Sequence, residues 1–398
     1  MFANAYIPYR GYYTTPFIRW QSVLQNEHPV RLAGATCKRW LAERKTGWDP
    51  MKVDYVNMGC TVAMKHAFWN GSWTSALLGA ERTVGVWVSQ ACSTFTTLVY
   101  QAAMAVEVGS AEWVLNVGAD RMSNGPHTIW PNPKGPGGYV EREDWVMDNF
   151  AYDPWAEEPM VDTADKIAQE EGITKQECDE LAYVRYTQYL RSLENDRAFQ
   201  KRFMYPIEVQ AGKKKTLLVD EDEGVTATSP EAIASLKPLN DWGVHSYAAQ
   251  THPADANAVL AVCSREKARE LAEPGPDIQL LSFGYGRAEK ARMGKAPVPA
   301  TEMALERAGL RPADIKVWKT HSPFVVNDIN MAKKLGISPI ERYNDYGCSM
   351  IYGHPQSPTM ARHLIEAIEQ LEMEGGGYGC VTGCAAGDTG ATLVFRVE

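Results

Sequence analysis

Two cysteines and two histidines stand at points of the sequence where a side chain can do chemistry. Cys92 follows an apolar run, Thr83–Ser89, and opens a segment rich in Ala and Val, so it lies between a predicted buried strand and a predicted helix. A thiol at the start of a helix is near unpaired backbone N–H groups and the positive end of the helix dipole, and both favour the thiolate. This position suits a nucleophile, although a cysteine in such a corner is more often a small buried residue.

His354 is flanked by Gly353 and Pro355, on a predicted turn ahead of a helix over 358–372. A rigid turn gives an imidazole the fixed placement that a base for thiol activation needs, whereas the alternative is a histidine that only caps the turn. His363 lies in the middle of the predicted helix beside an apolar stripe, and we predict that it is a core residue.

Cys384 ends a predicted strand and enters a turn of small residues, where the backbone can approach a ligand closely. His321 follows another predicted strand. Together with Cys380 these side chains raise the question of zinc. A Cys-x3-Cys pair with its histidines far upstream matches no known finger or ribbon spacing, so we predict no metal site.

The elements that must position these residues alternate between short apolar runs and longer helical ones. Strands are predicted at 54–58, 83–89 and 112–117, and helices at 30–45, 93–109 and 175–197. Alternation of this kind favours an α/β fold with a largely parallel sheet that is covered on both faces.

A repeated pattern indicates an internal duplication. Gly47 and Pro50 follow one predicted helix and precede a strand, and Gly309 and Pro312 do the same 262 residues later. We predict two α/β halves, residues 1–120 and 246–398, separated by an inserted region over 121–245 that begins with a loop rich in Pro and Gly.

The composition excludes several classes of protein. Of the 398 residues, 45% are hydrophobic and 22% charged, as in an ordinary globular chain, and the net charge of −9 argues against nucleic acid as a main partner. No run of 18 apolar residues and no export signal is visible, and the eight cysteines are scattered. We therefore expect reduced thiols, no membrane partner and a cytoplasmic location.

Taken in order, the motifs resemble those of the thiolase superfamily over nearly the whole chain. The resemblance rests on Cys92 after a strand, Gly118-Ala119-Asp120-Arg121-Met122-Ser123, His321-Ser322-Pro323-Phe324, Gly353-His354-Pro355, Cys384-Ala385-Ala386-Gly387, and a segment over 243–258 with Thr251 where the family usually has Ser. It implies a thiolase fold, in which the duplicated halves form a five-layered αβαβα sandwich with an inserted loop domain.

The resemblance also implies roles. Cys92 is the nucleophile that becomes acylated, and His354 takes its proton. Cys384 is the second acid/base, and His321 orients a water or donates directly at the oxyanion of the enolate. Coenzyme A is a co-substrate, and no cofactor is tightly bound. The remaining expected site residues are Ala386 and Gly387 in the oxyanion turn, Phe95, Met122 and Phe324 in the acyl pocket, and Thr251, Gln250, Lys201, Arg202 and Lys213 at CoA.

Some positions depart from the family pattern. His321 stands where Asn is commoner, and Ala386 replaces a glycine. Phe95 replaces a commoner Gly, and it either lines a pocket for a bulky acyl group or packs under the helix. These departures leave the nucleophile and the base intact and affect the acyl pocket and the second oxyanion hole.

The opening segment, AYIPYRGYYTTPFIRWQ, is similar to the thiolase subunits of anaerobic toluene breakdown. That resemblance implies cleavage of benzoylsuccinyl-CoA with CoA to benzoyl-CoA and succinyl-CoA. The family implies a homodimer, and the divergent motifs resemble those of a bacterial and archaeal branch that works with a small OB-fold/zinc-ribbon companion subunit. Two alternatives stay open: an enzyme that condenses another acyl-CoA, and a catalytically silent homologue that binds acyl-CoA.

Overall fold

The computed structural model describes residues 2–44, 47–212 and 215–398. The strands are β1 (Tyr6–Ile7), β2 (Tyr12–Thr14), β3 (Ile18–Arg19), β4 (Tyr55–Gly59), β5 (Val84–Val88), β6 (Trp113–Arg121), β7 (His127–Pro131), β8 (Val140–Asp144), β9 (Ile207–Gln210), β10 (Thr216–Val219), β11 (Ala254–Cys263), β12 (Ile278–Arg287), β13 (Ile315–His321), β14 (Gly377–Ala385) and β15 (Thr389–Val397). The helices are α1 (Pro29–Ala42), α2 (Asn70–Leu78), α3 (Thr94–Glu107), α4 (Met147–Ala151), α5 (Met160–Glu171), α6 (Lys175–Ser192), α7 (Glu194–Arg197), α8 (Pro230–Ala234), α9 (Arg265–Leu271), α10 (Pro297–Ala308), α11 (Val325–Leu335), α12 (Ser349–Tyr352) and α13 (Ser357–Met373).

The strand order shows the duplication. One half runs β4-β6-β11-β1 and the other β13-β14-β15-β12, with the first pair of each half parallel and the second antiparallel. The short strand β1 pairs with both β11 and β12, so the two halves form one hydrogen-bonded path. The prediction of a largely parallel sheet is wrong, because each half turns back through an antiparallel strand after its parallel pair.

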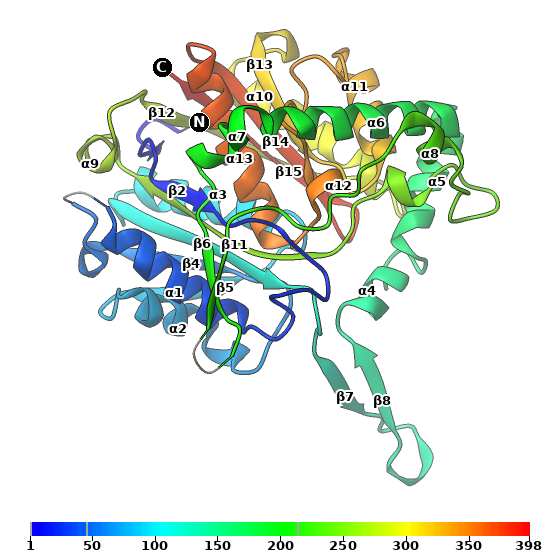
Figure 1. Ribbon diagram of the computed structural model, residues 1–398, viewed down its shortest axis with the longest axis horizontal. Coiled ribbons are helices and arrows are strands. Elements are labelled where there is room, and N and C mark those ends of the chain that lie inside the picture. Colours follow the sequence, from blue (N-terminus) through cyan, green and yellow to red (C-terminus); the bar gives the residue numbers. More distant parts are fainter. Residues whose placement is uncertain (1, 45–46, 213–214) are drawn as a thin grey trace.

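The helices complete five layers, as predicted. Helices α1 and α2 pack on the outer face of β4, β5, β6 and β11, and α10 packs on the outer face of β12 and β15. Helices α3 and α13 pack against each other between the two halves, α3 against β6 and α13 against β13 and β14 (Figure 1). These two central helices hold together a core that the halves share.

Local sequence explains the repeated turn. Helix α10 ends at Gly309, whose φ of +68° is a left-handed conformation that glycine adopts at little cost, and Gly47 follows α1 with a φ of +105°. A short 3-10 turn begins at Pro312 in one copy and at Pro50 in the other, and each leads into the first strand of its half. The repeat predicted from the sequence is confirmed.

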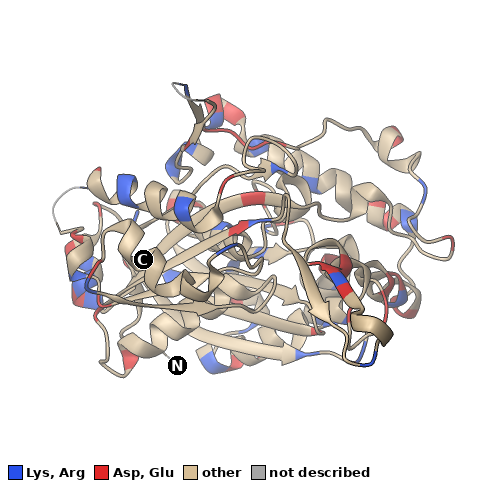
Figure 2. Ribbon diagram, turned by 90° about the horizontal axis from the view of Figure 1, so that it is seen from below, with Lys and Arg blue, Asp and Glu red and all other residues tan. Residues whose placement is uncertain are grey.

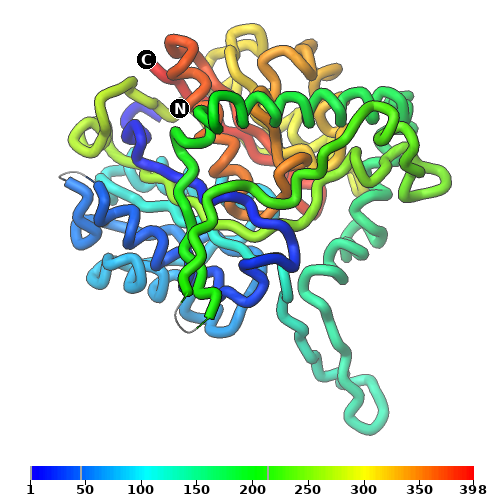
Figure 3. The backbone as a smooth tube through the Cα atoms, viewed as in Figure 1, coloured from blue at the N-terminus to red at the C-terminus, as the bar shows by residue number. Residues whose placement is uncertain are grey.

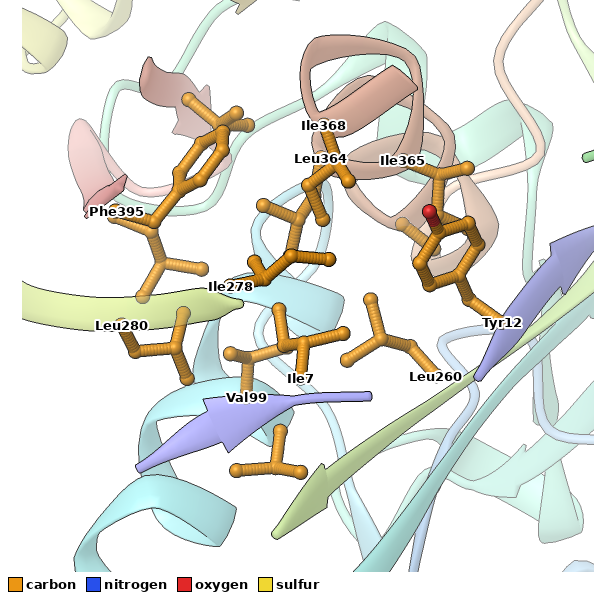
Figure 4. Close-up of a cluster of buried hydrophobic side chains, with 14 of the residues drawn as sticks. Ile7, Tyr12, Val99, Leu260, Ile278, Leu280, Leu364, Ile365, Ile368 and Phe395 are labelled. Carbon is orange, nitrogen blue, oxygen red and sulfur yellow. The ribbon is translucent and has the colours of Figure 1, made fainter. Parts of the chain in front are cut away.

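The central core explains why α13 lies where it does. Its residues Leu364, Ile365 and Ile368 are fully buried and face Leu260 of β11 and other strand and helix residues of the shared core (Figure 4). Truncating one such leucine to alanine costs about 2–5 kcal/mol, because the cavity does not close. The apolar face of α13 therefore fixes its position between the halves.

Two element predictions need correction. β5, predicted to be buried, is the last strand of the path, and Val84 and Trp87 on it are exposed. The helix predicted over 175–197 ends at Ser192, because Asn195 and Asp196 take left-handed φ values of 52° and 57°.

The inserted region contributes a two-stranded hairpin, β7–β8, that projects away from the layered body (Figures 1 and 3). Charged residues gather on the peripheral helices and loops, whereas the central strands carry few of them (Figure 2). Within the described ranges, no helix combines the length and the apolar character needed to cross a membrane.

Candidate active site

The starts of the two central helices bring the predicted nucleophile and the predicted base together. Cys92 lies two residues before α3, after Ala91 with its positive φ of 43°, and His354 lies three residues before α13. The parallel strands β13 and β14 end side by side, with His321 paired to Gly383. Cys384 follows Gly383, so the ends of two helices and two strands meet at one point.

Three of the predicted catalytic side chains form a tight cluster. Cys92, His321 and His354 each place a sulfur or ring nitrogen within 4.8 Å of the others, and all three are buried. The two imidazoles stack with their centroids 4.0 Å apart and their planes at 28°. Cys384 lies close by, and its sulfur accepts a hydrogen bond of 3.3 Å from Nδ2 of Asn327.

Burial sets the protonation of the cluster. It raises the pKa of Cys92 to about 12, although hydrogen bonds from the backbone of Ala386 and of Cys92 itself act in the opposite direction. The backbone N–H groups favour the thiolate, but desolvation outweighs them in the free site. Burial also holds the pKa of His354 and of His321 well below the ordinary value, so both rings are neutral.

A hydroxyl group lies within hydrogen-bond distance of Nδ1 in each imidazole ring. Nδ1 of His354 lies 2.6 Å from Oγ1 of Thr359, and Nδ1 of His321 lies 2.8 Å from Oγ of Ser349. Nε2 of both rings is buried and has no hydrogen-bond partner in the described part of the chain. A hydroxyl can donate or accept, so each ring can present either an N–H or a lone pair to the site.

Ser349 is itself held at each of its polar atoms. Its N–H donates to Nε2 of His363 at 3.3 Å, its carbonyl accepts from Oγ1 of Thr251 at 2.7 Å, and its hydroxyl meets His321. His363 is a buried residue, as predicted, but it also supports the site. Sequence reasoning missed Ser349 because its contacts join three distant segments.

A pocket of about 390 Å³ opens on Cys92. Met122, Ala386 and Gly387 line it, as the prediction for the acyl pocket and the oxyanion turn requires. Most of the remaining lining is apolar and comes from the inserted region: Trp145, Val146, Phe150, Pro154, Trp155 and Met160, beside the polar Asn149 and Asp153. These residues were not predicted from the sequence, because the sequence of a loop does not show which surface the loop covers.

Two residues predicted for the acyl pocket lie elsewhere. Phe95 is fully buried in the central core and packs against Gly118, so the alternative that it packs under the helix is the correct one. Phe324 belongs to a different apolar cluster and packs edge-on against His245. Neither side chain lines the pocket at Cys92.

A second hollow of about 570 Å³ lies behind His354. Gln250 and Arg19 line it, and so does His252, whose carbonyl accepts the backbone N–H of His354 at 2.8 Å. Thr251 is not part of its wall, because the Thr251 hydroxyl is directed to Ser349. None of Cys92, His321, His354 and Cys384 is among the described residues that line this hollow, and His252 is its contact with the cluster.

The basic residues predicted to meet CoA do not line either of these spaces. Arg202 forms ion pairs with Glu369 and Glu372, and Lys201 pairs with Asp196. Both cations border a separate hollow beside α1, so this geometry gives no support to their placement at CoA. Lys213 lies outside the described residues.

Comparison with known proteins identifies the class. The N-terminal domain of thiolases matches residues 11–266, and the C-terminal domain matches residues 276–397. The chain therefore belongs to the thiolase family. As in that family generally, it is an acyltransferase that uses CoA as a substrate without a tightly bound cofactor.

Relatives cover most of the chain at modest identity. An acetyl-CoA acetyltransferase of Syntrophomonas wolfei is 28% identical over 369 residues, covering 89% of this chain and 90% of its own. A beta-ketoadipyl-CoA thiolase of Pseudomonas knackmussii is 26% identical, covering 96% of both.

Solved structures share the fold. The Bacillus anthracis acetyl-CoA acetyltransferase superposes with a TM-score of 0.91 at 24% identity, covering 100% of this chain and 99% of its own. Human mitochondrial 3-ketoacyl-CoA thiolase in complex with CoA superposes with a TM-score of 0.88 at 22% identity, covering 99% and 98%.

Proposed function

We propose that this chain cleaves a β-ketoacyl-CoA with CoA, through an acyl group carried on Cys92. The observation that carries the proposal is the buried cluster of Cys92, His354 and His321, with Cys384 beside it. A carbon–carbon bond next to a thioester breaks only when a nucleophile attacks the ketone and the developing enolate meets hydrogen-bond donors. The cluster contains a group for each of these tasks.

His354 activates Cys92 in the first step. Its neutral ring donates Nδ1–H to Thr359 and presents the Nε2 lone pair to the thiol. Because the thiol is protonated in the free site, the proton moves to His354 as the sulfur attacks the ketone. The backbone N–H of Ala386, which already donates to the Cys92 sulfur, is positioned to meet the new oxyanion.

Cys384 and His321 serve the leaving enolate. Collapse of the tetrahedral adduct leaves an acyl group on Cys92 and an enolate, whose carbon takes a proton from Cys384 while Nε2–H of His321 donates to its oxygen. Asn327 donates to the Cys384 sulfur and so supports the resulting thiolate. This thiolate then takes the proton of the incoming CoA thiol, and the CoA sulfur removes the acyl group from Cys92.

The two spaces suggest which part of the substrate lies where. We assign the CoA part to the hollow behind His354, because that hollow borders His252 beside His354 and carries Arg19 as a cation for phosphate. The pocket at Cys92 is apolar and aromatic, and no Lys or Arg lines it among the described residues. These features suit an uncharged aryl group on the acyl-enzyme, as cleavage of benzoylsuccinyl-CoA to benzoyl-CoA and succinyl-CoA requires.

The direction and the alternatives are decided by experiment. The same groups run in reverse would condense two acyl-CoA molecules, and a silent homologue would bind acyl-CoA without turnover. The test measures the intact mass of the protein after brief exposure to benzoyl-, succinyl-, acetyl- and acetoacetyl-CoA. We expect one benzoyl adduct that is absent from Cys92→Ser and present in the control Cys380→Ala, whose cysteine lies in a separate core cluster.

The outcomes of this experiment distinguish the proposed functions from one another. Fastest labelling by acetyl-CoA would overturn the aryl substrate but leave the acyl-cysteine mechanism. If no donor gives an adduct, with or without a companion subunit, the remaining function is that of a catalytically silent homologue. Net formation or consumption of the β-ketoacyl-CoA by the active enzyme then gives the direction.

Assembly is also part of the proposal. A homodimer is suggested by β5, which ends the described strand path with Val84 and Trp87 exposed. A small OB-fold/zinc-ribbon companion is suggested only by the resemblance of the divergent motifs to those of one branch of the family. Light scattering of the purified chain tests the first, and full activity of this chain without any second polypeptide would overturn the second.

A further inference from the structure

The catalytic cluster is also a set of metal donors. Cys92 offers a thiol, and His321 and His354 offer one imidazole each, with the donor atoms within 4.8 Å of one another. Nε2 of both rings is buried and unpartnered within the described ranges, whereas both Nδ1 atoms are held by hydroxyls. One thiolate and two imidazoles form a donor set that binds zinc in preference to harder cations.

We propose that Cys92, His321 and His354 bind one zinc ion, which blocks the nucleophile reversibly. The ion would use the sulfur that the acyl group needs, so metal and acyl group exclude each other. Binding itself follows from the donor set alone. The loss of activity rests on the function proposed above.

The geometry comes close to what tetrahedral zinc requires. Bonds of about 2.0–2.3 Å place tetrahedral donors roughly 3.3–3.8 Å apart, so the cluster has to close by about 1 Å. Side-chain rotation supplies that movement, since the thiol is not bonded to either ring. The pocket at Cys92 gives the ion a path and leaves room for a water molecule as the fourth ligand.

The surroundings of the rings fit a metal site. Imidazole ligands generally donate their other N–H to an oxygen, which fixes the ring and makes the ligating nitrogen more basic. Oγ of Ser349 and Oγ1 of Thr359 are placed to accept these bonds. The same hydroxyls serve catalysis, so the metal state requires only a change of tautomer at His321.

The binding step releases one proton. The Cys92 thiol loses its proton to solvent as the S–Zn bond forms, the two neutral imidazoles each give a lone pair, and nothing is oxidised or reduced. The bound site carries one net positive charge.

His321 supplies the third strong donor of the proposed site. An asparagine would leave only one thiol and one imidazole, and an amide oxygen is a poor zinc ligand. His321→Asn therefore reduces the donor set to two strong ligands, and it changes no charge in the neutral site. This substitution is the sharpest test of the third ligand.

The first experiment measures metal content. The chelator-treated chain is mixed with excess zinc, passed through a desalting column and analysed for zinc per chain. We expect one zinc in the wild type and in Cys380→Ala, and at least a tenfold weaker affinity in Cys92→Ser and in His321→Asn. Cobalt in place of zinc should give a thiolate charge-transfer absorption that Cys92→Ser lacks. Stoichiometric binding that survives Cys92→Ser, or no binding in the wild type, overturns the proposal.

A second measurement avoids variants altogether. Alkylation of Cys92 by iodoacetamide in the wild type, followed by peptide mass, should slow at least tenfold with one equivalent of zinc and recover with EDTA. Unchanged alkylation overturns the proposal even if the variants fail to fold. If zinc protects Cys92 but no acyl-CoA labels it, the proposed function fails and the metal site stands.

Discussion

The hydroxyl of Ser349 lies 2.8 Å from Nδ1 of His321, whose Nε2 is buried and has no partner in the described chain. Because His363 and Thr251 hold the N–H and the carbonyl of Ser349, that hydroxyl cannot follow the ring if the ring turns. When Ser349 donates to Nδ1, the ring's own proton is on Nε2, the nitrogen that has no partner in the described chain. In the proposed mechanism Ser349 therefore makes His321 a hydrogen-bond donor to the enolate rather than a second base.

Ser349→Ala should lower kcat about tenfold with little change in KM for CoA, because a lost hydrogen bond of about 1.4 kcal/mol frees the ring without altering either binding space. Steady-state kinetics measure this split. The matched control is Ser246→Ala, which removes a buried hydroxyl that has no partner in the described chain. Equal losses in both variants would mean that the effect of Ser349 is only structural.

The fold was predictable where local patterns decide it. The repeated sequence of helix, glycine, proline and strand predicted both halves, since each residue acts within its own turn. The direction of later strands was not predictable, because pairing of β6 with β11 joins segments more than a hundred residues apart. Likewise, nothing local shows that β5 ends the sheet.

The candidate site was likewise predictable only in part. Cys92 and His354 were predictable because a strand–helix corner and a Gly-His-Pro turn are local features. Phe95 was not, since position in a motif does not reveal which face of α3 meets the core. The protonation of Cys92 depends on total burial, which a sequence does not show, and burial reversed the expected direction.

Asp120 should make stability depend on pH. Burial raises its pKa to about 6, from an ordinary value of 3.8, although the backbone N–H groups of Val62, Ser357 and Thr61 act in the opposite direction. The folded state thus binds this proton more tightly than the unfolded state. Stability contributed by Asp120 is fully present below about pH 4 and is lost as pH rises through about 6, on the order of 3 kcal/mol in total.

Asp120→Asn removes the titrating group, so the difference in unfolding free energy between wild type and variant should change by that amount between about pH 4 and pH 7. Urea unfolding across this range measures it. Hydrogen bonds lost in the variant add an offset that does not vary with pH. A flat difference for Asp120→Asn across this pH range would contradict the prediction.

We expect Arg19, rather than Lys201, to contribute to CoA binding. Arg19 lines the hollow behind His354, whereas Lys201 pairs with Asp196 beside a different one. Arg19→Ala should raise KM for CoA about tenfold through a lost phosphate contact, and Lys201→Ala should leave it unchanged. Steady-state titration with CoA decides between them, and the reverse order would restore the assignment made from the sequence.

Phe150 should help to select the acyl group. It lines the pocket at Cys92 from the inserted region, so Phe150→Ala removes an aromatic wall without touching the catalytic cluster. A lost apolar contact of about 1–3 kcal/mol predicts that the ratio of benzoyl to acetyl labelling of Cys92 falls roughly 10- to 200-fold. Phe68→Ala is the matched control, because Phe68 is 88% exposed and lies outside the pocket. The labelling ratio is read from intact mass in competition between the two donors. An unchanged ratio in Phe150→Ala would show that the acyl group extends elsewhere, since no other change is made to the wall of that pocket.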